Sequence, residues 1–124
     1  MVQSSEVYGR IDETGRVLLP VIVIASDGVE IEVEASVSLE FDGALAIHDD
    51  LSRSLGWRCL GARRVVIGFD THLVEHYIGM VCVGLEPQHV VVLGGIKKPA
   101  IIGQRLMSGR KLSLDFATGE VILK

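Results

Sequence analysis

Residues 29–38 constrain the fold more than any other stretch of the chain. Apolar residues alternate strictly with polar ones, and the polar positions are Glu30, Glu32, Glu34, Ser36 and Ser38. A period of two is typical of a β-strand with one face toward a core and the other toward water. The stretch therefore predicts a half-buried strand, which must pair with others in a sheet.

The preceding residues predict the partner of this strand. Residues 16–25 are rich in Val, Leu and Ile on both alternating faces, and we expect a strand buried on both sides. Ser26, Asp27 and Gly28 form the turn of a hairpin to the next strand. Before them we expect a loose leader over residues 1–7, a short strand over 8–11 and a turn over 12–15.

The middle of the chain predicts one short helix and a second hairpin. Asp49 is placed to cap a helix of about two turns, which Gly56 ends. Residues 62–69 and 72–83 predict two strands, the second broken at Gly79. The turn between them comprises Gly68, Phe69, Asp70 and Thr71.

The last third continues the pattern of short strands. We expect a strand over residues 88–93, a loop over 94–99, an apolar segment at 100–103 and a closing hairpin over 111–124. With 124 residues, 48% of them hydrophobic, the chain predicts one domain over residues 8–124.

Composition also narrows the functional classes. The longest apolar run is too short to span a bilayer and no leader of the secretory type begins the chain, so we expect a cytoplasmic protein without a membrane partner. Cys59 and Cys82 are then expected as reduced thiols. The basic residues are scattered without interleaved aromatics, which argues against nucleic-acid binding.

The order and spacing of several segments resemble the retropepsin-like aspartic proteases, in particular their small single-domain prokaryotic members. The acidic strand enters Ser38-Leu39-Glu40-Phe41-Asp42-Gly43, where the family has Asp-Thr-Gly-Phe-x-Gly. A hairpin follows where the family has its flap. Ile101, Ile102 and Gly103 then precede a short helix, which corresponds to a second family signature.

The resemblance implies an all-β fold: a retropepsin-like closed β-barrel or sandwich with a flap hairpin and one or two short helices. It places the cleft and flap at Phe41, Gly43, Gly68, Phe69, Asp70, Thr71, Ile101, Ile102 and Gly103. It also implies a homodimer, in which Leu39 stands where the family has its interlocking Thr.

The departure from the family motif decides the functional expectation. Ser38 replaces the catalytic Asp, and a hydroxyl that does not ionise near neutral pH cannot activate the attacking water. We therefore expect a catalytically inactive homologue that acts as a peptide-binding or regulatory module, needs no cofactor and binds an extended peptide or protein segment. The alternative is an active aspartic-type endopeptidase, in which Glu40 or Asp42 and its twin in a dimer share a proton.

A metal-binding motif forms a third possibility. Residues 72–76 read His-Leu-Val-Glu-His, the H-x-x-E-H pattern of some zinc peptidases, which requires a helix. We expect a strand here, in which the two His residues lie about 13 Å apart at about 3.3 Å per residue. Zinc bonds of about 2 Å cannot bridge that separation, so we expect no metal site.

Overall fold

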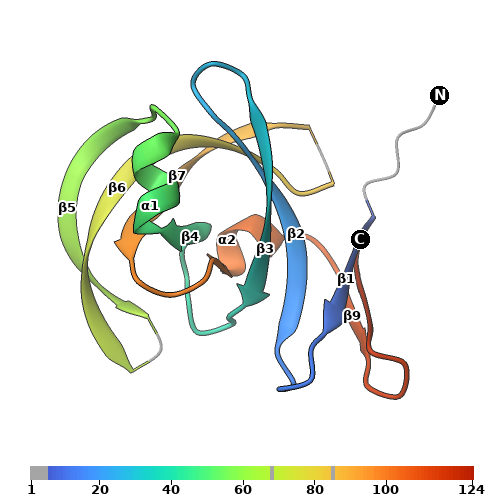
Figure 1. Cartoon of the computed structure of the whole chain (residues 1–124). Coiled ribbons are helices and arrows are strands. Elements are labelled where there is room, and N and C mark those ends of the chain that lie inside the picture. Colours follow the sequence, from blue (N-terminus) through green and yellow to red (C-terminus); the bar gives the residue numbers. More distant parts are fainter. Residues whose placement is uncertain (1–5, 68, 85) are drawn as a thin grey trace.

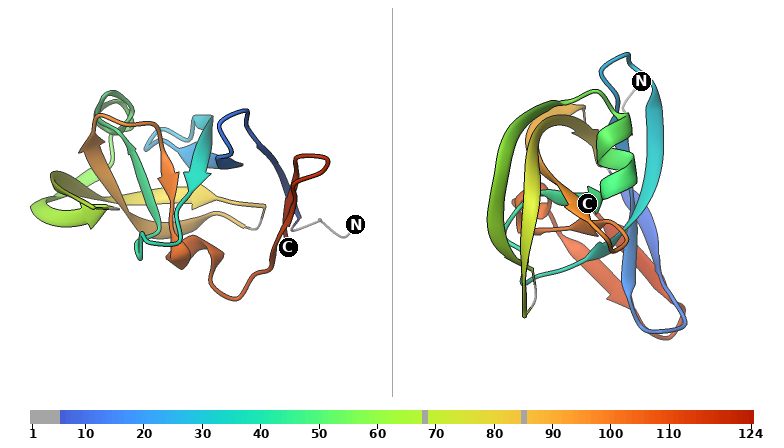
Figure 2. Two further views of the ribbon diagram at one scale, coloured as in Figure 1. Left: turned by 90° about the horizontal axis from the view of Figure 1, so that it is seen from below. Right: turned by 60° about the vertical axis from the view of Figure 1, so that its left-hand side comes forward.

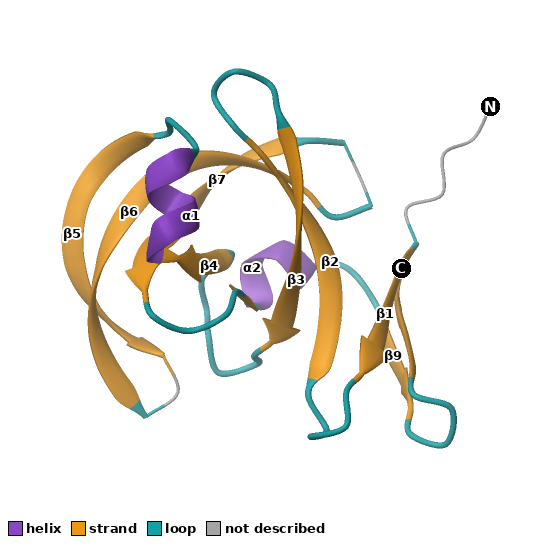
Figure 3. Cartoon of the chain, viewed as in Figure 1, coloured by secondary structure: helices purple, strands orange, loops and turns teal. Residues whose placement is uncertain are grey.

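The structure is a computed structural model that describes residues 6–67, 69–84 and 86–124. Over these residues the chain forms ten strands and two short helices (Figures 1 and 3). In chain order they are β1 (Val7–Ile11), β2 (Val17–Ile24), β3 (Glu30–Val37), β4 (Leu45–His48), α1 (Asp49–Ser54), β5 (Arg58–Ile67), β6 (Asp70–Cys82), β7 (Gln88–Ile96), β8 (Ile101–Ile102), α2 (Gln104–Met107), β9 (Leu112–Asp115) and β10 (Glu120–Leu123). The predicted all-β class is confirmed.

A single sheet closes on itself. The strands follow the order β5-β6-β7-β4-β8-β3-β2-β1-β10-β9, and an additional antiparallel pairing joins β6 to β2. This pairing places Ile22 opposite Cys82 and closes a ring of six strands. The order around the ring is β6-β7-β4-β8-β3-β2. Closure removes free edges within the ring and encloses the main core, whose fully buried members include Leu19, Leu45 and Ile102.

The alternation in residues 29–38 forms the predicted strand. Glu30, Glu32 and Glu34 are exposed on one face of β3, and Ala35 is buried on the other. We predicted that β2 is buried on both faces. Leu19, Val21 and Val23 are fully buried on one face, whereas Ile22 and Ile24 on the other face are only half-buried.

Several element boundaries differ from the sequence prediction. Val7 belongs to β1 rather than to a leader, because it pairs with Leu123 and is buried. The cap of α1 is His48, whose Nδ1 accepts a hydrogen bond from the Asp50 amide, and Asp49 is the first helical residue instead. The predicted end at Gly56 agrees with its φ of 71°.

Glycines inside strands account for two further differences. β6 continues through Gly79 without a break, since the missing side chain makes room for the ring of Trp57, 2.7 Å from where a Cβ would lie. Gly94 is part of β7 rather than of a loop, because it pairs with Glu75 and faces Ser52. Glycine thus marks close packing at both positions.

A hairpin and a three-stranded ribbon extend from opposite ends of the ring. The hairpin of β5 and β6 lies at one end and the ribbon of β1, β10 and β9 at the other (Figure 2). In the part of the chain that the structure describes, no helix is long and apolar enough to cross a membrane.

A buried carboxylate attaches α1 to the end of β7. Asp49 is 7% exposed and accepts hydrogen bonds from Arg53 Nε at 2.9 Å and Lys97 Nζ at 3.1 Å. The hydrogen bond from Arg53 and then that from Lys97 lower the pKa of Asp49 below its usual value. A charged Asp49 therefore stabilises the folded chain.

We predict that Asp49→Asn lowers the free energy of unfolding at pH 7 more than Asp50→Asn, a control at an exposed neighbouring position. The pKa of Asp49 is lower in the folded than in the unfolded chain, so its contribution is present above about pH 4 and is lost as pH falls further. Urea titrations should show the difference between wild type and Asp49→Asn shrinking below that pH. An equal loss at every pH would contradict this role of the charge.

Candidate binding cleft

The loop that follows β3 is held by a strand from far along the sequence. The Ser38 amide donates to the Ile102 carbonyl at 3.0 Å, and the amides of Gly103 and Gln104 donate to the carbonyls of Ala44 and Phe41 at 2.9 and 3.0 Å. β8 thus runs between β3 and β4 and pairs with both. This placement brings residues 101–103 beside the loop of residues 38–43.

Gly103 is required by this crossing. A Cβ at this position would lie 2.3 Å from the Gly43 carbonyl oxygen and 2.6 Å from that of Phe41. Gly43 in turn lies against the ring of Phe41, 2.5 Å from where its own Cβ would be. Both glycines therefore allow the backbone and an aromatic ring to pack closely.

Residues 38–42, at the start of this loop, lie in different environments. Ser38 is half-buried at the end of β3, whereas Leu39 and Glu40 are exposed on the turn. The Gln104 side-chain amide donates to the Leu39 carbonyl, which ties the turn to α2. Asp42 is also exposed, and Phe41 between these acids is only 3% exposed.

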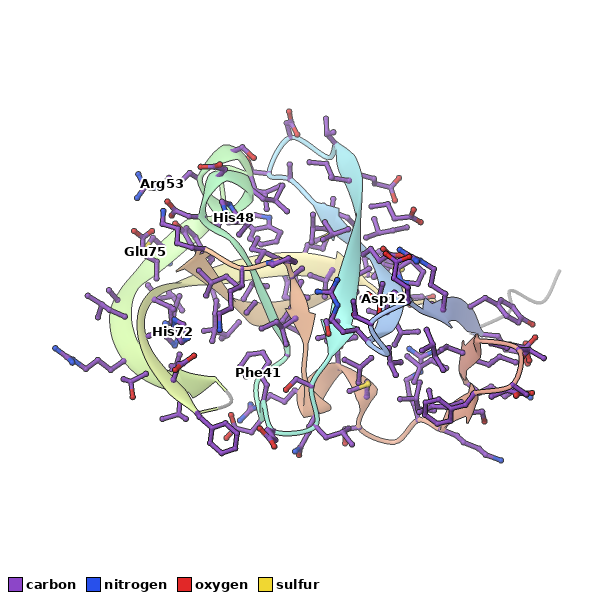
Figure 4. The ribbon with its side chains drawn as sticks, turned by 60° about the horizontal axis from the view of Figure 1, so that its bottom comes forward. Asp12, Phe41, His48, Arg53, His72 and Glu75 are labelled. Carbon is purple, nitrogen blue, oxygen red and sulfur yellow. The ribbon has the colours of Figure 1, made fainter. Side chains whose placement is uncertain are left out.

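Phe41 connects the loop to the base of the β5–β6 hairpin. It forms a second apolar cluster with Ala46, Val74, Leu93 and Ile96, against which Val65 and Ile101 pack. Figure 4 shows Phe41 on the loop and His72 on the hairpin, from β6. The cluster sets the position of the hairpin relative to the loop.

A cleft of about 750 Å³ lies between the loop and the hairpin. Its lining comes from the loop, from β5, β6 and β7, and from α2: Phe41, Asp42, Gly43, Ala44, Val65, Val66, His76, His89, Val90, Val91, Leu93 and Arg105. A second hollow of about 460 Å³ shares Asp42 and Arg105 with it. The volume is within the range of sites that bind small molecules and short segments.

The predicted cleft residues are only partly in this lining. Phe41 and Gly43 line the cleft, whereas Ile101 packs against the Phe41 cluster and Ile102 is buried in the main core. Gly103 lies between backbones.

The predicted flap tip also differs. Asp70 and Thr71 lie in β6, where they pair with Ile67 and Val66, rather than in the turn. Phe69 is 99% exposed, and Gly68 lies outside the described residues.

Sequence reasoning missed most of the cleft wall. Val91 and Leu93 alternate along β7, and His76 lies opposite Leu93 on the neighbouring strand. The apolar run in residues 88–93 predicted a strand. It did not indicate which face would meet the loop, because the ring closure determines that.

Burial shifts the pKa of two groups that do not line the cleft. Burial, and then the hydrogen bond to Glu75, raise the pKa of Tyr77. Burial lowers the pKa of Arg110, whose Nη1 donates to the Val83 carbonyl at 2.6 Å.

The H-x-x-E-H stretch lies in β6, as predicted, so its His residues lack the helical spacing that the zinc motif requires. Among the described residues, no group of three or more His, Cys, Asp or Glu side chains could hold a metal ion.

Comparison with known proteins supports the architecture. No protein-family model matches the sequence, and no curated protein matches it. Among solved structures, the fold is similar to the crystal structure of a retropepsin-like aspartic protease from Rickettsia conorii, with a TM-score of 0.70. The match has 15% sequence identity and covers 95% of this chain and 89% of that chain. The chain therefore has a retropepsin-like fold.

We predict that Gly103→Ala destabilises the chain by about 3 kcal/mol or more, because the added methyl group overlaps two carbonyl oxygens. Gln104→Ala is the control, since its exposed side chain gives up only the hydrogen bond to Leu39. Chemical denaturation measures both. Similar free energies of unfolding for the two variants would show that the backbones separate easily.

Proposed function

We propose that this chain is a peptide-binding or regulatory module with a retropepsin-like fold that does not hydrolyse its ligand. One observation carries the proposal: a cleft of about 750 Å³ lies beside the loop, while residue 38 at the entrance to that loop carries a hydroxyl instead of a carboxyl. The binding space is thus present without the ionisable group that would activate water. We place the module in the cytoplasm, without a nucleic-acid or membrane partner.

The cleft suits an extended segment. Phe41, Val65, Val91 and Leu93 provide apolar walls for side chains. β5 is a terminal strand of the sheet, so its outer edge has backbone groups that can pair with an added strand. Main-chain hydrogen bonds to such an edge provide affinity, and pockets for alternate side chains provide specificity.

An aspartic-type endopeptidase remains the alternative, and the geometry distinguishes its two candidate acids. Asp42 lines the cleft, whereas Glu40 is exposed on the turn and is not part of the lining. Asp42 is therefore the better candidate for this chemistry, with a twin from a second subunit.

We predict that Val91→Asp abolishes binding to peptides selected from a random library displayed on phage, because a carboxylate would then project from the apolar wall. Leu114→Asp is a matched control: Leu114 is 40% exposed on β9, outside the cleft, and Val91 is 43% exposed. Fluorescence anisotropy of the selected peptides measures the affinity. Circular dichroism checks that both variants fold.

Two results would contradict the proposal. If selection yields no peptide whose binding depends on Val91, the cleft is not the binding site. Alternatively, the chain cleaves the peptides at acid pH and loses this activity in Asp42→Asn or Glu40→Gln, in which case it is an enzyme.

We further propose a homodimer that uses the loop after β3. Leu39 is 68% exposed there, and two such side chains can pack across a twofold axis. The neighbouring Glu40 is also exposed, so its carboxylate would approach its twin.

We predict that Glu40→Gln strengthens this dimer about threefold at pH 7.5, because it removes repulsion between like charges near the axis. Glu13→Gln, an exposed acid on the turn before β2, is the control with the same change in net charge. Sedimentation velocity over a range of concentrations measures the dissociation constant. Monomers at every concentration for all three proteins would rule out the dimer.

A further inference from the structure

The cleft contains more side chains that can carry a positive charge than side chains that carry a negative one. Asp42 is its one carboxylate among the described residues, whereas His76, His89 and Arg105 can each carry a positive charge. Arg105 is always protonated. Within the described part of the chain, no salt bridge to its guanidinium is found, although six other cationic side chains make one. The cleft thus has an available permanent cation.

One imidazole nitrogen of His72, which lies on β6 like His76, is unpaired among the described residues. Nε2 of His72 is buried and has no hydrogen-bond partner among the described residues. His72 lies opposite Val65, a residue of the cleft wall, and is four residues from His76, so both His side chains project from one face of β6. His72 itself does not line the cleft, so the histidines available to a ligand there are His76 and His89.

Arg105 lies where an extended ligand would contact its guanidinium. Arg105 and Asp42 line both the cleft and the second hollow, so a segment that continues from one into the other passes beside both residues. The Arg105 amide donates to the Gly43 carbonyl at 3.2 Å, which anchors its backbone beside the loop. A guanidinium at this point can pair with a carboxylate of the passing segment.

We propose that the ligand is an acidic peptide, with carboxylate side chains interleaved with apolar ones. This inference rests on the proposed peptide-binding function and specifies its ligand. The apolar side chains contact Phe41, Val65 and Val91, and the carboxylates face Arg105, His76 and His89. Asp42 opposes such a ligand, so its charge limits the affinity.

Two synthetic heptapeptides with blocked ends test the proposal. One alternates Val with Glu, and the other alternates Val with Gln. We expect the Glu peptide to bind more tightly in low salt, and Arg105→Gln to weaken that peptide about fivefold while the Gln peptide is unaffected. Asp42→Asn strengthens binding of the Glu peptide. Added salt reduces the difference between the peptides, because it screens exposed charges.

Arg64→Gln is the matched control. Arg64 is exposed on β5 next to Val65, lies opposite Leu73 and does not line the cleft. Arg64→Gln removes the same charge as Arg105→Gln. An equal loss of affinity for the Glu peptide in the two variants would overturn a specific role for Arg105.

The remaining outcomes separate the two proposals. Equal affinity for both heptapeptides, with binding lost in Val91→Asp, would overturn the acidic selectivity and leave the peptide-binding function intact. Failure of both heptapeptides and of every library peptide to bind would overturn both.

Discussion

The structure depends on the close approach of two backbones, the segment around Gly103 and the loop after β3. Four hydrogen bonds join them, from the amides of Ser38, Gly103, Gln104 and Arg105 to carbonyls on the opposite segment. Such bonds form only at short range, and a side chain at residue 103 would occupy the space of two carbonyl oxygens. The absence of a Cβ therefore allows β8 to enter between β3 and β4.

This crossing determines what surrounds the cleft. It orients the loop so that Phe41 is buried against the base of the hairpin, while Asp42 on the next position is exposed at the cleft. It also places Arg105 at the junction of the cleft and the second hollow. An apolar anchor, an acid and a cation are thus set beside the crossing point, on backbone that hydrogen bonds hold in place.

The fold is similar to that of a retropepsin-like aspartic protease, and residue 38, which enters the loop after β3, is a serine. Fold similarity at 15% identity describes architecture and leaves the chemistry to the individual side chains. Here those side chains are a hydroxyl, an exposed leucine and an exposed glutamate. A cleft of this kind can bind an extended segment, because strand pairing and apolar contact need no catalytic group.

The amino-acid sequence by itself determined the strand at β3, its hairpin with β2 and the absence of an acid at residue 38, because these depend on neighbours in the chain. Local periodicity also identified residues 72–76 as a strand. It could not distinguish a glycine that ends a strand from one that packs inside it, as at Gly79 and Gly94, since the Trp57 and Ser52 side chains that decide this are distant in sequence. Only the tertiary structure decided that β5, β6 and β7 would form the cleft wall and that Asp42 rather than Glu40 would face it. The closure of the sheet through β2 and β6 brings these residues together, and no local pattern encodes that pairing.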